Sequence, residues 1–72
     1  MAELKFFGYL SDLVGTREKD LSLDHPMPLR ELVPSGFPES NIIILINQRV
    51  GNLDSEITNQ DCVVVMPILS GG

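Results

Sequence analysis

The sequence predicts an α+β domain in which a mixed β-sheet carries one main short helix on one face. Two observations predict this class. Strand-like runs of alternating or β-branched residues begin and end the chain, and only short stretches between them have helical spacing. With 72 residues the chain forms one domain at most. Such a domain buries only about 60% of the surface that its unfolded chain exposes, so a deep catalytic cleft is hard to build.

The chain begins with a predicted strand in ELKFFGY, residues 3–9. Alternation along this strand puts Leu4 and Phe6 on one face and Phe7 on the other. A second, half-exposed strand follows in REKDLSL, residues 17–23. We expect the two strands to form an antiparallel hairpin with a long connection.

Two short segments have apolar residues at helical spacing. The first lies inside the hairpin connection and ends at Gly15; its apolar residues are Leu10, Leu13 and Val14. The second is the predicted main helix, which starts at Pro28 and stops at Pro34, so it has at most about two turns. Its apolar stripe consists of Leu29, Leu32 and Val33.

The segment NIIILINQRV, residues 41–50, is the strongest strand signal. Its unbroken apolar run predicts a strand that is covered on both faces, or nearly so. Asn47-Gln48 is expected to form a tight turn into a short continuation strand, RVG.

The last third of the chain holds a polar connection and a final strand. LDSEITNQD is predicted to form a turn and a short helix, with Asp54 and Asp61 as turn or cap residues. CVVVMPI is the final strand, with Val63 and Val65 towards the core, and Pro67 ends its ladder because proline has no N–H to donate.

The order of these elements is typical of the ubiquitin-like β-grasp. We expect the strand that follows the main helix to pair parallel to the first strand through a right-handed crossover, with the first and last strands as neighbours. The predicted domain organisation is a β-grasp domain over residues 1–66 and a flexible C-terminal tail over residues 67–72.

Composition excludes some classes of partner. The net charge is −5 and only five residues are Lys or Arg, which argues against binding nucleic acid or an anionic membrane. A basic protein partner would suit this charge, although the charge also simply favours solubility. One cysteine, Cys62, allows no intrachain disulfide, and no signal peptide or membrane span is predicted, so we expect a cytoplasmic protein. With one His and one Cys, no metal site is expected.

The C-terminal sequence MPILSGG follows directly on the predicted buried strand. Glycine has no Cβ, so a Gly-Gly end can enter a narrow channel and leaves its carbonyl unshielded. We therefore expect the terminus itself to be the working part of the molecule.

Three segments resemble the small subunit of molybdopterin synthase (the MoaD group) and its sister, the thiazole sulfur carriers (the ThiS group). They are FFGYLSDLVGT, INQRV and NQDCVVVMPILSGG, and the likeness covers nearly the whole chain. The Phe6-Phe7 pair and the proline at position 67 favour the molybdopterin group. The stretch between Pro28 and Asn41 is shorter and richer in proline than the family's usual helix region.

The resemblance implies a chemistry for the tail. The Gly72 carboxylate is adenylated by an ATP-dependent, ubiquitin-activating-like enzyme, and sulfur from a donor then displaces AMP to give a thiocarboxylate. The large catalytic subunit of molybdopterin synthase uses that sulfur. This chain catalyses nothing alone, binds no cofactor, and threads its tail into the partner; the threaded residues are Pro67, Ile68, Leu69, Ser70 and Gly71.

The same tail allows other uses. One alternative is a sulfur carrier for thiazole in thiamine synthesis, and another is a ubiquitin-like modifier attached through Gly72 to a target lysine. A plain interaction module with incidental glycines is the third. Deleting the two glycines, or searching for conjugates of higher mass, separates these readings.

A docking face is predicted from strand alternation. Phe7 and Met66 are expected to form an exposed apolar patch near the tail, Val50 could join it, and Arg49 could reach an acidic group of a partner. The competing interpretation is that these residues are core, because a register error of one residue turns every side chain to the other face.

Overall fold

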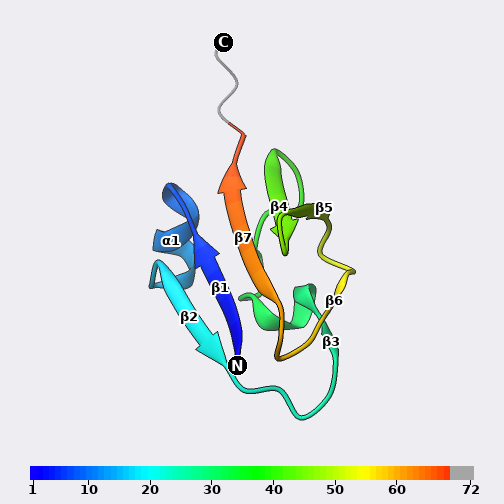
Figure 1. Ribbon diagram of the computed structural model, residues 1–72. Coiled ribbons are helices and arrows are strands. Elements are labelled where there is room, and N and C mark those ends of the chain that lie inside the picture. Colours follow the sequence, from blue (N-terminus) through cyan, green and yellow to red (C-terminus); the bar gives the residue numbers. More distant parts are fainter. Residues whose placement is uncertain (69–72) are drawn as a thin grey trace.

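The computed structural model describes residues 1–68, which form a five-stranded sheet with two short helices (Figure 1). The strand order is β2-β1-β7-β4-β5. The strands of this sheet are β1 Ala2–Phe6, β2 Glu18–Leu21, β4 Ile42–Ile46, β5 Arg49–Gly51 and β7 Cys62–Pro67. A separate two-stranded sheet pairs β3 Met27–Pro28 with β6 Glu56–Ile57. The helices are α1 Tyr9–Val14 and the 3₁₀ helix η1 Leu29–Leu32.

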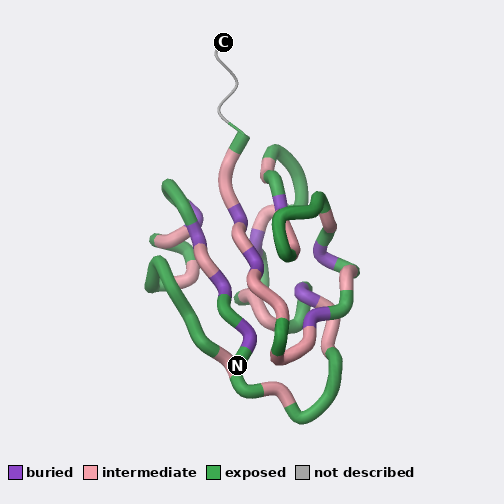
Figure 2. Tube along the Cα trace, viewed as in Figure 1, coloured by how far each residue is buried: buried purple, intermediate pink, exposed green. Residues whose placement is uncertain are grey.

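The core lies on one face of the sheet. Buried residues alternate along β1 and β7, as Figure 2 shows, and Leu4, Phe6, Val63 and Val65 are all fully buried. Helix α1 and η1 cover this face. The buried residues that pack together here are Ala2, Leu4, Phe6, Leu10, Leu29, Phe37, Ile44, Leu53, Ile57, Val63 and Val65. The predicted face assignments for β1 and β7 are therefore confirmed.

The two central strands, β1 and β7, are parallel, and β2 lies antiparallel to β1. This is the β-grasp arrangement that the element order predicts. One detail of the prediction is wrong: the strand after the crossing segment, β4, pairs antiparallel to β7 and does not touch β1 in the ladder. The last strand, β7, lies between β1 and β4, because its unbroken apolar run is best suited to the centre of the sheet.

The predicted main helix is a single 3₁₀ turn. Pro28 is extended (ψ 144°) and pairs with β6, while Val33 is extended because it precedes Pro34, so only four residues are left for a helix. The first N–H groups of η1 donate to loop carbonyls: Leu29 to Ser55 (3.0 Å) and Arg30 to Leu53 (2.8 Å). The longer helix is α1, which lies within the hairpin connection and ends at a left-handed Gly15, as predicted.

Arg30 links η1 to the loops that contain Glu39 and Asp54. Its guanidinium donates to Glu39 (2.7 Å) and to Asp54 (3.1 Å), and these hydrogen bonds raise the pKa of Arg30 above its usual value. Asp54 lies in a turn, as predicted, and its carboxylate also takes part in this pair. All three side chains are well exposed, so the pairs add little stability.

The segment predicted as a turn and short helix, residues 53–61, contains no helix. Side chains satisfy its backbone locally: Asn52 Oδ1 accepts from Asp54 N–H (2.8 Å), and Ser55 Oγ accepts from Asn52 N–H (3.1 Å). Such side-chain turns compete with helix formation. Ile57 is fully buried and pairs with Met27, which makes a short strand the better solution here.

The β4–β5 hairpin has the predicted turn. Asn47 and Gln48 both have positive φ (53° and 70°), as a type I′ turn requires. The expectation that both faces of β4 are covered is wrong. Ile44 faces the core, whereas Ile43 on the other face is 36% exposed, because the two described helices, α1 and η1, both pack on the core side.

Candidate functional site

The end of β7 carries the chain out of the sheet. Pro67 pairs with Ile42 at the end of the ladder, and the next residue, Ile68, donates its N–H to the carbonyl of Asn41 (2.9 Å). The Ile68 side chain is 48% exposed. Figure 1 shows this end of the molecule between α1 and the β4 end of the sheet.

The predicted reactive end, Gly72, lies outside the described residues, as do Leu69, Ser70 and Gly71. Their roles in the tail stay predictions. Pro67 and Ile68, the first residues of the predicted tail, are described: β7 includes Pro67, one residue beyond the predicted boundary at residue 66.

The face of the sheet opposite the core is open and largely apolar near the end of β7. Met66 pairs with Ile43, and Phe7, whose N–H donates to Val65 (3.0 Å), continues the β1 ladder beside Met66. Val64 pairs with Leu45, which pairs with Val50 at the edge. We call this surface the apolar face; its residues are Phe7, Ile43, Leu45, Val50, Val64 and Met66.

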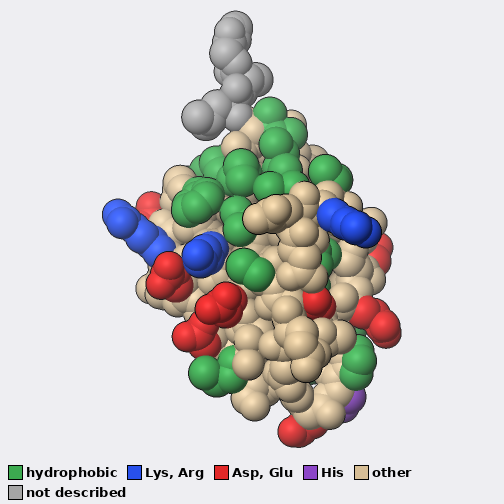
Figure 3. All heavy atoms as spheres, viewed as in Figure 1, with side chains coloured by type: hydrophobic (Ala, Val, Ile, Leu, Met, Phe, Trp, Pro, Cys, Tyr) green, Lys and Arg blue, Asp and Glu red, His purple; other side chains and the backbone are tan. Residues whose placement is uncertain are grey.

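The apolar face is accessible. Phe7 is 49% exposed and Val50 is 81% exposed. Hydrophobic side chains gather at this end of the molecule in Figure 3. Residues directly opposite each other in a ladder share a face, so the predicted grouping of Phe7, Met66 and Val50 agrees with the observed register.

Arg49 does not belong to the apolar face. It pairs with Ile46 and precedes Val50, so alternation points its side chain to the other face of the edge strand, where Arg49 is exposed. The expectation that Arg49 reaches an acidic group of a partner stays a prediction.

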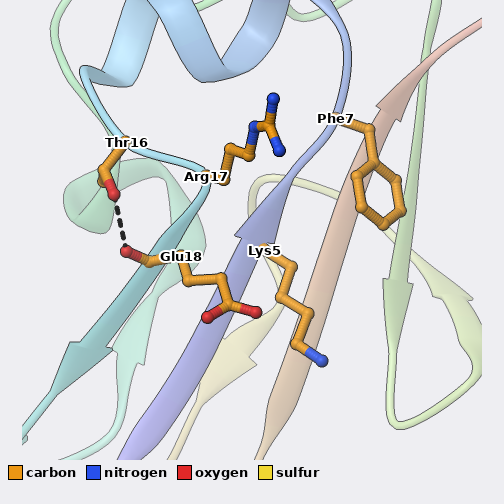
Figure 4. A pocket seen from close by; sticks show the side chains of 5 residues that line it. All are labelled: Lys5, Phe7, Thr16, Arg17 and Glu18. Atoms are coloured by element: carbon orange, nitrogen blue, oxygen red, sulfur yellow. Dashed lines mark hydrogen bonds between the residues drawn. The ribbon is translucent and has the colours of Figure 1, made fainter.

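A shallow hollow borders the apolar face where β1 meets β2. Figure 4 shows its lining, which consists of Lys5, Phe7, Thr16, Arg17 and Glu18. Thr16 Oγ1 donates to the Glu18 carbonyl (2.9 Å) and closes the turn that leads into β2. Two cations therefore stand beside an exposed aromatic ring. Sequence reasoning missed this hollow, although Lys5 and Phe7, two residues apart in one strand, had to share a face.

Asp61 organises the start of β7. Its carboxylate accepts from the Thr58 N–H (2.7 Å) and from Asn47 Nδ2 (2.8 Å), and these hydrogen bonds lower the pKa of Asp61, the Thr58 N–H most strongly. Asn47 Oδ1 in turn accepts from the Cys62 N–H (2.9 Å). The β4–β5 turn and the polar turn before β7 are thus joined, and the turn role expected for Asp61 is confirmed.

Residues 1–68 contain neither a metal-binding cluster nor a membrane-spanning helix. No three His, Cys, Asp or Glu side chains in this part of the chain lie where they could share a metal ion. None of its helices is long and apolar enough to cross a bilayer.

Known proteins match this chain over nearly its full length. The model of the ThiS family matches residues 4–72, a span that includes both the apolar face and the Gly71–Gly72 end. Among curated proteins, no match was found.

Several solved structures have the same fold. A proposed molybdopterin converting factor, subunit 1, from Pyrococcus furiosus is 23% identical, with a TM-score of 0.67 over 94% of this chain and 97% of that one. SAMP1 from Haloferax volcanii is 18% identical, with a TM-score of 0.71 over 99% and 98%. The HVO 2177 protein of the same organism is 19% identical, with a TM-score of 0.69 over 99% and 85%. At these identities the likeness establishes the fold alone, and it confirms the ubiquitin-like β-grasp.

Proposed function

Because the chain belongs to the ThiS family, we propose that it is a sulfur carrier that works through a thiocarboxylate on Gly72. The observation that carries the proposal is the extent of the family match, which runs through residue 72 and so includes the two glycines. The fold also supports the proposal, because β7, the strand that ends at Pro67, lies at the centre of the sheet.

The chemistry needs an activating partner. A carboxylate is a poor electrophile, so an oxygen of the Gly72 carboxylate first attacks the α-phosphate of ATP and releases pyrophosphate. Hydrosulfide (HS⁻) supplied by a donor then attacks the acyl-adenylate carbonyl and expels AMP, which leaves –COSH. ATP and the catalytic groups belong to the activating enzyme, which holds the reacting atoms in place.

We infer that the sulfur goes to molybdopterin, with this chain as the small subunit of molybdopterin synthase. The Phe6-Phe7 pair and Pro67 favour that branch, and one structure with the same fold is a proposed molybdopterin converting factor subunit. The large catalytic subunit would then receive the tail, and the cytoplasm is where we expect it to do so. The apolar face, which lies beside the end of β7, suits a partner that also binds the tail.

A second candidate function is covalent protein modification. Its support is the fold shared with SAMP1, a small archaeal modifier protein from Haloferax volcanii. An acyl-adenylate on Gly72 could equally react with a lysine amine and form an isopeptide bond. Both functions need the same activated end, so one chain could serve both.

Gene deletion followed by complementation tests the proposal. In the molybdopterin case, the deletion strain loses molybdenum-dependent enzyme activity and still grows without thiamine. The wild-type chain restores the activity, and a chain that lacks Gly71 and Gly72 does not, although both fold. A requirement for thiamine would instead assign the thiazole route, and high-mass conjugates that disappear with the two glycines would support the modifier function.

A further inference from the structure

We propose that Gly8 is a positioning residue for the tail. Through its contact with Pro67, Gly8 acts together with the Asn41 carbonyl to fix the point and direction from which the last residues leave the sheet. This inference rests on the proposed function for its purpose, but the contacts themselves are properties of the chain alone.

Gly8 has an unusual backbone conformation and packs closely against Pro67. Gly8 has φ 59° and ψ −144°, a region that is open essentially only to glycine. A Cβ at this position would lie 3.0 Å from Pro67 Cγ and 3.4 Å from Pro67 Cδ. The proline ring therefore rests on the backbone of the loop after β1, in space that any other residue would fill.

Asn41 supports the other side. It has a positive φ of 60°, and its carbonyl accepts the Ile68 N–H at 2.9 Å. Pro67 itself has its φ restricted by its ring. Two loops from the neighbours of β7 thus hold consecutive residues, Pro67 by packing and Ile68 by a hydrogen bond.

The position of Pro67 and Ile68 matters because Gly72 is only four residues beyond Ile68. Four residues after Ile68 span at most roughly 14 Å when fully extended. A displacement at Pro67 therefore shifts the set of points that Gly72 can reach, and a misplacement of about 1 Å can cost a reaction 100-fold.

Other glycines show that this contact is specific. Gly15 and Gly36 also have positive φ (93° and 87°), yet a Cβ on either would meet nothing within 4 Å. A Cβ on Gly51 would approach Ile46 Cδ1 (2.6 Å) and Ser55 Oγ (3.1 Å), but Gly51 does not have a positive φ. Among the described glycines, Gly8 alone combines a positive φ with a close neighbour, and that neighbour is the residue from which the tail departs.

A double-mutant cycle tests the inference on the isolated chain. The variants are Gly8→Ala, Pro67→Ala and the double variant, with Gly36→Ala as the control for backbone strain without a clash. Hydrogen exchange at the Ile68 amide, measured by NMR and compared with the stability of each variant in urea, reports the Ile68–Asn41 hydrogen bond.

We expect Gly8→Ala to speed Ile68 exchange on the order of tenfold beyond its effect on global stability, and the double variant to recover most of that protection. Gly36→Ala should change Ile68 exchange only as far as it changes global stability. Should Gly8→Ala fail to fold, Pro67→Ala alone, which creates no backbone strain, should still speed Ile68 exchange. Unchanged exchange at Ile68, or effects that simply add in the cycle, would overturn the inference.

A second measurement tests whether the position of Pro67 affects sulfuration of the tail. The thiocarboxylated fraction of each variant is measured by intact mass after a short expression in the native host. We expect Gly8→Ala to be sulfurated on the order of tenfold more slowly than Gly36→Ala, and Pro67→Ala to restore part of the rate in the double variant. Equal rates for the two glycine variants would overturn the positioning role and leave the sulfur-carrier proposal intact. A wild-type chain without thiocarboxylate would contradict the proposed function. The hydrogen-exchange experiment would still decide whether Gly8 positions Pro67 and Ile68.

Discussion

Ionisation of the Asp61 carboxylate is linked to the stability of the fold. Its pKa is lowered by hydrogen bonds from the Thr58 N–H and Asn47 in the folded chain. A carboxyl group with a depressed folded pKa stabilises the protein at all pH values above its unfolded pKa of about 3.9, and that contribution is lost as the pH falls through the folded pKa.

We therefore predict that Asp61→Asn destabilises the chain by about 1–2 kcal/mol at pH 7, because one charged acceptor is lost. The difference between wild type and variant should shrink below about pH 4, where the wild-type carboxylate becomes protonated. Urea unfolding between neutral and acidic pH measures it. A difference that stays constant down to the lowest pH would show that ionisation of Asp61 is not involved.

Phe6 and Phe7 are adjacent residues with opposite environments. Phe6 is fully buried and its ring packs edge-on against Phe37, with centroids 6.0 Å apart, whereas Phe7 is 49% exposed. We predict that Phe6→Ala lowers the free energy of unfolding by about 3–5 kcal/mol. Phe7→Ala should change it by less than about 1 kcal/mol. Equal losses in urea unfolding would contradict the face assignment of β1.

Among the elements, the β4–β5 hairpin offers a stabilising change. Gln48 occupies a turn position with φ 70°, where a side chain is strained and glycine is not. We predict that Gln48→Gly raises the free energy of unfolding by about 0.5–1 kcal/mol and leaves the fold unchanged. Thermal unfolding compares the two chains. A loss of stability would mean that the Gln48 side chain makes contacts worth more than the backbone strain.

The five strands of the main sheet could be predicted from the sequence, whereas the short strands β3 and β6 were predicted as helical segments. Alternation and apolar runs are local signals, and they placed β1, β2, β4, β5 and β7 correctly. The segment after Pro28 was predicted as a helix because its apolar spacing is helical. Tertiary hydrogen bonds to Leu53 and Ser55, together with the extended residue before Pro34, reduce it to one 3₁₀ turn. Both partners of β1, β2 and β7, were predicted, but the predicted pairing of β4 with β1 was wrong, because strand order depends on contacts far apart in the chain.

At the scale of the whole molecule, the fold separates a covered face from an open one. Strand alternation predicted that Phe7 and Met66 point away from the core, and the register brings them together with Ile43. The role expected for Arg49, reaching an acidic group of a partner, stays a prediction. The shallow hollow that includes Lys5 and Arg17 depends on how the β1–β2 connection folds, which the sequence does not specify.

We predict that Phe7→Asp weakens binding of the large partner subunit at least about tenfold, because it puts a charge into an apolar contact. Leu13→Asp is the matched control, since Leu13 is equally exposed (50%) but lies on α1, which packs against the covered face. Co-expression of each variant with the large subunit, followed by a binding titration, measures the difference. Equal weakening by both variants would argue against the apolar face as the binding surface.

The central claim is that the sheet presents Gly72 for conversion to a thiocarboxylate by other proteins. Intact mass spectrometry of the chain purified from its own cells tests this claim most directly. We predict a population heavier by one oxygen-to-sulfur exchange, located at Gly72 and absent from cells that lack the activating enzyme. Only unmodified carboxylate on Gly72, in cells that are actively making the cofactor, would contradict the account.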